Sequence, residues 1–305
     1  MSILVDENTS YCIQGITGKQ GSSGCKSMLK AQSKVVCGVT PGKGGQEVEG
    51  IPVYNSIEEA KQAGHKIDCS VVYVPPKFAK AAIVEAAEAK IPLINVITEN
   101  IAVHDMAYCL ALAKKNESRI IGATSAGIYS VGKSKSGSIA SGKSQIAFCK
   151  GKIGIISRSG GMSSETSLVL KQAGLGQSTV VSIGSDILMG TRFVELIELF
   201  EKDAETEWIV IFGEIGGSSE EELAEYLIKR KKEGNVYTKP IVAFISGRFA
   251  ANFSDVSLGH AGAIIEGNVG TREGKVKALK EAGVIIAEYH HKIGELMKKA
   301  LQSRV

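Results

Sequence analysis

Short apolar runs rich in valine and isoleucine recur along the whole chain. Runs short enough for β-strands occupy residues 11–16, 34–39, 69–74, 92–98, 119–123, 152–157, 179–184, 207–214, 239–246 and 283–288. Between them, apolar residues recur at three- and four-residue spacing, the period of an amphipathic helix. This spacing is clearest in residues 76–90, 192–203, 219–234 and 275–283. Because strands and helices alternate, the pattern predicts parallel sheets covered by helices on both faces.

The periodicity weakens in the middle of the chain. Residues 127–151 are rich in glycine, serine and lysine, a composition typical of loops and junctions. We therefore predict an α/β protein of two domains. A Rossmann-like domain is expected over residues 1–126, a linker over 127–150, and a flavodoxin-like domain over 151–305.

The overall composition narrows the function classes. The 305 residues are 44% hydrophobic and 22% charged, with a net charge of +4, and the lysines are scattered, so nucleic acid is not an expected partner. Six cysteines show no metal-binding spacing and are expected to be free thiols, with no metal site. The opening residues do not resemble a targeting signal, and no apolar run approaches the length of a membrane span. We expect a cytoplasmic protein that does not bind membranes.

Two glycine turns in the first domain suit a phosphorylated ligand. Gly15, Gly18 and Gly21 lie in "CIQGITGKQGSSG", between a strand and a helix, where backbone N–H groups can approach a phosphate. A second turn, "VTPGKGGQ", carries Lys43 where a dinucleotide-binding fold has an acidic residue for ribose. This favours a ligand other than NAD. A plain tight connection at the first turn and a solvated Lys43 at the second remain alternatives.

The second domain also has a glycine turn between a strand and a helix, and it contains a candidate nucleophile. Ser159, Gly160 and Gly161 follow a strand and precede a helix, which predicts an anion site. Glu214 lies at the end of another strand, where it can serve as a cap, an ion-pair partner or a residue that orients an imidazole. His260, in "SLGHAGAIIEG", lies among small residues that let a ligand approach closely. The other histidines, His65, His104, His290 and His291, are expected to be surface or capping residues.

Taken in order, these segments resemble the α subunit of the succinyl-CoA synthetase family. The resemblance rests on "MSILVDENT", "QGITGKQG", "GVTPGKGG", "VITE", "SRSGG", "FGEIGGSSEEE", "TKPIV" and "GHAGAI", and it covers the chain almost from end to end. It implies a CoA-binding domain followed by a ligase domain. It also implies a β subunit with an ATP-grasp domain, which binds ATP or GTP with Mg²⁺ and without which this chain is inactive.

The resemblance also assigns roles to individual residues. The residues that it implies for CoA are Thr17, Gly18, Lys19, Gln20, Lys43, Ile97, Thr98 and Glu99. His260 would carry the phosphoryl group with Glu214 as its hydrogen-bonding partner. Ser159, Gly160 and Gly161 would hold the phosphate.

Two departures from the family pattern concern the acid substrate. The usual "GPNCPG" is "GATSAG" here, and Ser164 replaces a tyrosine that contacts substrate in succinate enzymes. The segments "SRSGGMSSE" and "FSDVSLGHAGA" are closer to citryl-CoA synthetase and ATP-citrate lyase. We therefore expect citrate ahead of succinate, with hydroxyl groups from Thr124, Ser125, Ser163 and Ser164 at the acid. A non-catalytic, CoA-responsive protein and an NAD-linked oxidoreductase are the competing hypotheses; intact His260, Glu214 and Lys43 argue against the former, and the missing ribose-binding acid against the latter.

Overall fold

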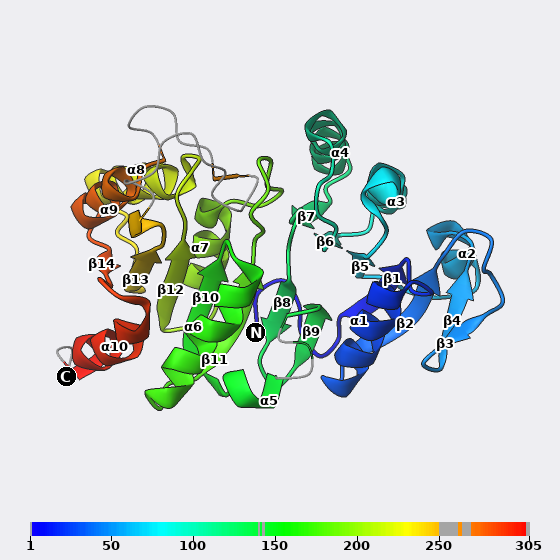
Figure 1. The fold of residues 1–305 in the computed structure, drawn as a ribbon, viewed down its shortest axis with the longest axis horizontal. Coiled ribbons are helices and arrows are strands. Elements are labelled where there is room, and N and C mark those ends of the chain that lie inside the picture. The colour runs from blue at the N-terminus through cyan, green and yellow to red at the C-terminus, as the bar shows by residue number, and fades with distance from the viewer. Residues whose placement is uncertain (1, 140, 142–143, 250–261, 264–269, 303–305) are drawn as a thin grey trace.

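The computed structural model describes residues 2–139, 141, 144–249, 262–263 and 270–302. Within these ranges the chain forms two seven-stranded sheets side by side, each accompanied by helices (Figure 1). The α/β class expected from the hydrophobic pattern is confirmed.

The first sheet lies in the N-terminal part of the chain, in the order β3-β4-β2-β1-β5-β6-β7. Its pairs are parallel except for the antiparallel pair β3 and β4. The strands are β1 (Ser10–Gln14), β2 (Lys34–Val39), β3 (Glu47–Val48), β4 (Ile51–Tyr54), β5 (Cys69–Val72), β6 (Leu93–Val96) and β7 (Arg119–Ile121).

The second sheet has the order β14-β13-β12-β10-β11-β8-β9. The strands are β8 (Gly127–Ser130), β9 (Ser134–Gly137), β10 (Lys150–Ser157), β11 (Gln177–Ser182), β12 (Trp208–Gly213), β13 (Ile241–Ile245) and β14 (Ile285–Ile286). Strands β8 and β9 join antiparallel to the edge at β11. They come from residues 127–150, expected as a linker, so this segment contributes two strands to the second sheet. The domain limits themselves stay a prediction.

Helices connect the strands in both halves. They are α1 (Lys19–Lys30), α2 (Ile57–Gln62), α3 (Pro76–Glu88), α4 (Val103–Lys115), α5 (Ser144–Ala147), α6 (Gly160–Gln172), α7 (Phe193–Lys202), α8 (Ser219–Lys232), α9 (Arg272–Glu281), the 3₁₀ turn η2 (His290–Lys292) and α10 (Ile293–Gln302). Helix α8 shows why such segments are helical. It carries glutamates in its first turn and basic residues in its last turn, so its charges complement the helix dipole.

The sheets meet along a seam lined by hydroxyl groups. Ser134 of β9 hydrogen-bonds to the Tyr11 hydroxyl at 2.7 Å, and Ser136 accepts from the Asn95 amide at 2.9 Å. Ser138 pairs with Tyr73 at 2.8 Å. Because each buried hydroxyl has a partner across the seam, the polar strand β9 can be buried without leaving these groups unsatisfied.

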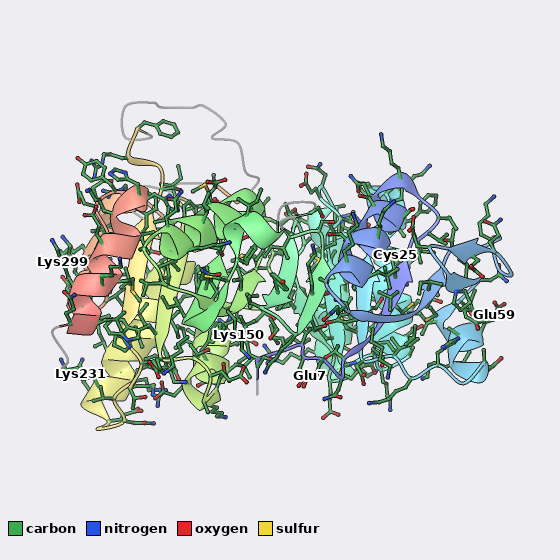
Figure 2. The ribbon with its side chains drawn as sticks, turned by 90° about the horizontal axis from the view of Figure 1, so that it is seen from below. Glu7, Cys25, Glu59, Lys150, Lys231 and Lys299 are labelled. Carbon is green, nitrogen blue, oxygen red and sulfur yellow. The ribbon has the colours of Figure 1, made fainter. Side chains whose placement is uncertain are left out.

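The valine and isoleucine strands form the interior, as their apolar pattern predicts. Charges of both signs lie outside: Glu59 projects at one end of the molecule, and Lys231 and Lys299 at the other (Figure 2). The cysteines are free thiols. In the part of the chain that is described, no helix is long and apolar enough to cross a membrane.

Candidate functional site

The first glycine turn brings strand β1 and helix α1 into close contact. Gly15 has a φ of +82°, a conformation that glycine adopts without strain. A Cβ on Gly21 would lie 2.1 Å from the Gly15 carbonyl oxygen. Helix α1 begins after Gly18, and no side chain of the described residues caps this end. The helix start therefore offers backbone N–H groups to an anion.

A cavity of about 880 Å³ opens at this helix start. It brings together Gly18, Lys19 and Gln20 with Ile97, Thr98 and Glu99, two groups that the sequence predicts for CoA. The cavity is also lined by residues that the sequence analysis missed: Ser23, Tyr73, Val74, Pro75, Pro76, Asn100, Ser138 and Ser141. Residues 73–76 directly follow strand β5, and this position at a strand's carboxyl end was the available signal. Not every predicted side chain faces a ligand: the Thr98 hydroxyl donates to the Val74 carbonyl at 2.7 Å.

A second, adjoining cavity of about 560 Å³ shares Gly18 with the first and adds Thr17. Its rim includes Pro41 and Asn55. The Asn55 side-chain oxygen Oδ1 accepts from the backbone N–H groups of Gly42 and Gly44, both at 3.0 Å. These bonds fix the glycine loop that presents Lys43, which is exposed and lines neither cavity.

In the second half of the molecule, the glycine turn at Ser159, Gly160 and Gly161 begins helix α6. The Ser159 hydroxyl caps the helix by accepting from the Met162 N–H at 3.4 Å. Ser163 is fully buried, and its hydroxyl donates to the Gly160 carbonyl at 2.6 Å, whereas Ser164 is half-buried. A Cβ on Gly160 would lie 2.7 Å from that of Ala126. The helix start therefore packs directly against the loop at residues 122–126.

That loop carries Thr124 and Ser125, which the sequence predicts for the acid. Ser125 is buried, and its hydroxyl donates to the Ser182 carbonyl at 2.6 Å while accepting from the Gly127 N–H at 2.9 Å. These bonds give the Ser125 hydroxyl a structural role. Thr124 has a φ of +57°, and its hydroxyl reaches Asp186 at 3.3 Å. It thereby ties the loop to the turn after β11.

Glu214 follows strand β12 and is 8% exposed. Nearby, Arg158 lies just before the α6 turn and is 2% exposed. Its guanidinium donates to the Gly216 carbonyl at 2.9 Å, and its Nε has no hydrogen-bond partner among the described atoms. Arg158, Asp186 and Gly262 line one cavity of about 460 Å³. The turns after β10, β11 and β12 thus meet at one place, as expected at the carboxyl edge of a parallel sheet.

His260, the predicted nucleophile, lies outside the described residues. Gly262, two positions later, is described and buried, and its N–H donates to the Ser185 carbonyl at 3.0 Å. A Cβ on Gly262 would lie 2.8 Å from the Arg158 guanidinium. Only glycine therefore fits at this position beside Arg158.

The other histidines have structural surroundings. His65 hydrogen-bonds to the Tyr54 hydroxyl at 2.9 Å, and His104 is exposed beside Asp105. His290 lies against Phe212 and Phe244 and contacts Thr166 at 3.0 Å. Burial lowers the pKa of His290 below its ordinary value. In the described part of the chain, no group of three or more His, Cys, Asp or Glu side chains is placed to hold a metal ion.

Together these features define a class: an α/β protein with one glycine turn at a helix start in each half, both suited to anionic ligands. Comparisons with known proteins specify the class further. A family model described as a CoA binding domain matches residues 6–100, and one described as CoA-ligase matches residues 156–291. The chain is 45% identical over 305 residues to the succinate–CoA ligase [ADP-forming] α subunit of Aquifex aeolicus, covering 99% of this chain and 95% of the relative.

Two further relatives cover the chain almost completely. One is the succinate–CoA ligase [ADP-forming] subunit α 1 of Archaeoglobus fulgidus, 45% identical over 288 residues, which are 94% of each chain. The other is the ADP-forming sulfoacetate–CoA ligase subunit SqwL of an Acholeplasma species, 40% identical over 299 residues, which are 98% of each chain. The chain therefore belongs to the family of ADP-forming CoA ligase α subunits, and it carries the CoA-binding and CoA-ligase domains of these enzymes.

Among solved structures, the chain resembles the ATP citrate lyase of Methanosaeta concilii in complex with (3S)-citryl-CoA, with a TM-score of 0.89 and 24% identity. The match covers 99% of this chain but 51% of the lyase chain, so this protein spans about half of that enzyme. At this identity the likeness supports the fold alone. Citrate, expected from the sequence, is thus not favoured over the acids named for the closer relatives in sequence.

Proposed function

We propose that this chain is the α subunit of an enzyme that joins CoA to a small acid at the expense of a nucleoside triphosphate, through phosphorylated His260. The imidazole attacks the terminal phosphoryl group and the nucleoside diphosphate leaves. The acid's carboxylate then takes the phosphoryl group from His260, giving an acyl phosphate. Finally the CoA thiol attacks the acyl carbon, which releases phosphate and forms the thioester.

The observation that carries this proposal is the meeting of three turns beside Gly262. Residues 217–219 of the turn that follows Glu214, the buried Arg158 and the segment after β11 line one cavity with Gly262, two residues beyond the proposed nucleophile. A carboxylate can orient the imidazole and favour its cationic form. The backbone N–H groups at the start of α6 suit the phosphoryl oxygens.

The first domain is proposed to hold CoA in its two adjoining cavities. The exposed start of α1, with Gly18, Lys19 and Gln20, suits the phosphates because of its N–H groups and the lysine charge. Residues 97–99 also line the larger cavity, and Lys43 would add a positive charge from the neighbouring loop. Ser138 and Ser141 follow strand β9 of the second sheet, so the bound CoA would touch both halves.

The nucleotide and Mg²⁺ are proposed to bind mainly on a separate β subunit with an ATP-grasp domain. The relatives are named as subunits of ADP-forming ligases, which supports a second chain. We propose cytoplasmic catalysis by this complex.

For the acid, we propose succinate, with sulfoacetate as the second candidate. Succinate is supported by the relatives at 45% identity. Sulfoacetate is supported by the relative at 40% identity and by half-buried Ser164, whose hydroxyl can donate to a sulfonate oxygen where a tyrosine ring is otherwise expected. Both acids carry an anionic group at each end.

The test is a comparison of kcat/KM for succinate, sulfoacetate and citrate with the complete two-subunit enzyme. We expect succinate or sulfoacetate to exceed citrate at least about tenfold, a difference of about 1.4 kcal/mol in transition-state binding. Ser164→Tyr should lower kcat/KM for sulfoacetate more than for succinate, because a ring fills the space beside the hydroxyl. A preference for citrate would contradict the proposed acids and leave the phosphohistidine chemistry standing.

A further inference from the structure

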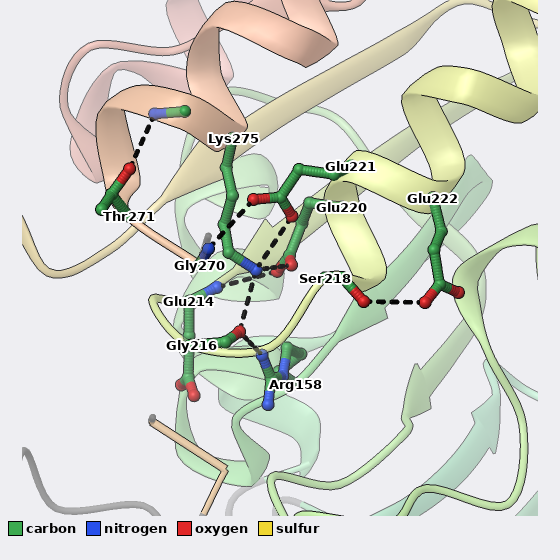
Figure 3. A network of polar contacts seen from close by, with 11 residues as sticks. Arg158, Glu214, Gly216, Ser218, Glu220, Glu221, Glu222, Gly270, Thr271 and Lys275 are labelled. Atoms are coloured by element: carbon green, nitrogen blue, oxygen red, sulfur yellow. Dashed lines mark hydrogen bonds and ion pairs between the residues drawn. The ribbon is translucent and has the colours of Figure 1, made fainter. Parts of the chain in front are cut away.

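A buried lysine joins the Glu214 turn to helix α9. Lys275, in the first turn of α9, is 0% exposed, and its ammonium forms an ion pair with Glu220, which is also 0% exposed (Figure 3). The ammonium donates to the Gly216 carbonyl at 2.9 Å and lies 3.5 Å from a carboxylate oxygen of Glu221. Lys275 therefore has two hydrogen-bond acceptors and a second carboxylate around its charge, which offset the cost of burying it.

Glu220 connects Lys275 to the backbone of Glu214. One carboxylate oxygen of Glu220 binds Lys275, and the other accepts from the Glu214 backbone N–H at 3.1 Å. A Cβ on Gly213 would lie 2.7 Å from the latter oxygen, so the glutamate packs closely under the turn. Figure 3 shows the Glu214 side chain directed away from this ion pair. The backbone of Glu214 is thus held from one side while its carboxylate faces the other.

Lys275 is also linked to the glycine turn at the start of α6, because it shares a hydrogen-bond acceptor with the residue that precedes this turn. The Gly216 carbonyl accepts from both Lys275 and Arg158, each at 2.9 Å. Arg158 directly precedes Ser159, the cap of α6. In addition, the Gly216 N–H donates to the Gly270 carbonyl at 2.8 Å. One buried cation is therefore linked to the Glu214 turn, to the residue that leads into α6, and to the backbone just before α9.

We propose that Lys275 and Glu220 are positioning residues for phosphorylation: they fix the Glu214 backbone, and through it the carboxylate that orients His260. This inference rests on the proposed function. Its physical basis is that a buried, hydrogen-bonded ion pair favours a single geometry, and a small displacement of a catalytic group lowers the rate strongly. Neither residue lines the cavity beside Gly262.

Two double variants separate positioning from simple stability. Lys275→Met with Glu220→Leu replaces the pair by apolar side chains, a change that proteins often tolerate, but it removes the acceptor for the Glu214 N–H. Lys275→Met with Glu220→Gln also removes both charges, yet it keeps an amide oxygen at the acceptor position. Lys239→Met is the matched control, because Lys239 is a partly buried lysine of the same half that binds the carbonyls of Phe200 and Asp203.

The readout is the rate of His260 phosphorylation by MgATP in the two-subunit complex, measured well below each variant's unfolding midpoint. We expect the Leu double variant to lose at least about tenfold in kcat for phosphorylation with the nucleotide KM unchanged. The Gln double variant should recover most of this loss, and Lys239→Met should match the wild type. Adding Glu214→Gln to the Leu double variant should cost less than about twofold more, because both changes act on one carboxylate.

The outcomes distinguish this inference from the function on which it rests. If the wild type is not labelled on His260, the proposed function fails. If the wild type is labelled and the folded Leu double variant is labelled within about twofold of its rate, the positioning role is wrong. Equal losses in the Leu and Gln double variants, or a strictly additive effect of Glu214→Gln, would also overturn it.

Discussion

Two buried lysines, one beside the Glu214 turn and one at the seam between the sheets, solve the same physical problem differently. Lys275 in the ligase half is surrounded by carboxylates and a carbonyl group. Lys135, on strand β9 at the seam between the sheets, is 1% exposed, and its ammonium donates to the Ser27 hydroxyl at 2.6 Å. Burial, with no acidic partner among the residues that the structure describes, lowers the pKa of Lys135 to about 8.

The difference shows what each region does. At the seam, neutral hydroxyl groups join the two sheets, and the unpaired lysine is a cost to the fold. Around Glu214 the buried charge is balanced, and its partners are Gly216 in the turn after β12 and two glutamates, Glu220 and Glu221, at the start of α8. A balanced buried pair favours one geometry over others, which suits a turn that holds the carboxylate proposed to orient His260.

Replacing each lysine by methionine should change stability in opposite directions. Lys275→Met leaves the Glu220 carboxylate buried without its cation, so we expect the free energy of unfolding to fall by about 3–5 kcal/mol at pH 7. Lys135→Met removes a buried charge and one hydrogen bond to a hydroxyl, so the free energy of unfolding should rise by about 2 kcal/mol at pH 7. Denaturant unfolding of both variants and the wild type measures these changes.

The increase in the free energy of unfolding caused by Lys135→Met depends on pH. The direction of this dependence follows from the lowered pKa of Lys135. The unfolded lysine has a pKa of about 10.5 and the folded one about 8, so unfolding takes up a proton between these values. Wild-type stability therefore rises with pH across this window by about 3 kcal/mol relative to the variant. Below pH 8 the gain should stay near about 2 kcal/mol, and near pH 10.5 it should have turned into a loss of about 1 kcal/mol, the contribution of the lost hydrogen bond to Ser27. A gain that is independent of pH would contradict this account of Lys135.

A third lysine, Lys43, is exposed, and changing it should alter a free energy less than the two changes at buried lysines. Lys43→Glu reverses a charge on the loop beside the cavity proposed for CoA, so we expect CoA to bind about tenfold more weakly, or by about 1.4 kcal/mol, with less loss at high salt. Phosphorylation of His260 should not change. Lys26→Glu, on the exposed side of α1, is the matched control and should leave CoA binding within about twofold, as calorimetric titration can measure.

The fold was predictable where burial follows an apolar pattern. Strands such as β5 and β12 are buried along their whole length, so each appears in the sequence as an apolar run. Strand β9, with the sequence SKSG, is also completely buried, yet its side chains are polar because their partners lie across the seam. Such partners are distant in sequence, 123 positions for Tyr11 and Ser134, and no local pattern reveals them.

The candidate site was also predictable only in part. The glycine turns at Gly15 and Gly160 were predictable, because a strand, a turn and a helix start lie together in the sequence. Lys275 and Glu220 were not, since they are separated by 55 positions and charged residues in an amphipathic helix are expected to face solvent. For Ser125 the sequence could not show that its hydroxyl hydrogen-bonds to the backbone of the neighbouring strand; its role at the acid stays a prediction.

The most direct test of the central claim is to map the phosphoryl group after the two-subunit complex is incubated with MgATP and without CoA. We predict an acid-labile, alkali-stable label on the peptide that contains His260, close to one per α subunit. His260→Ala should abolish this label while CoA binds as tightly as in the wild type. A label that resists acid, or one that survives His260→Ala, would contradict the proposed phosphohistidine mechanism.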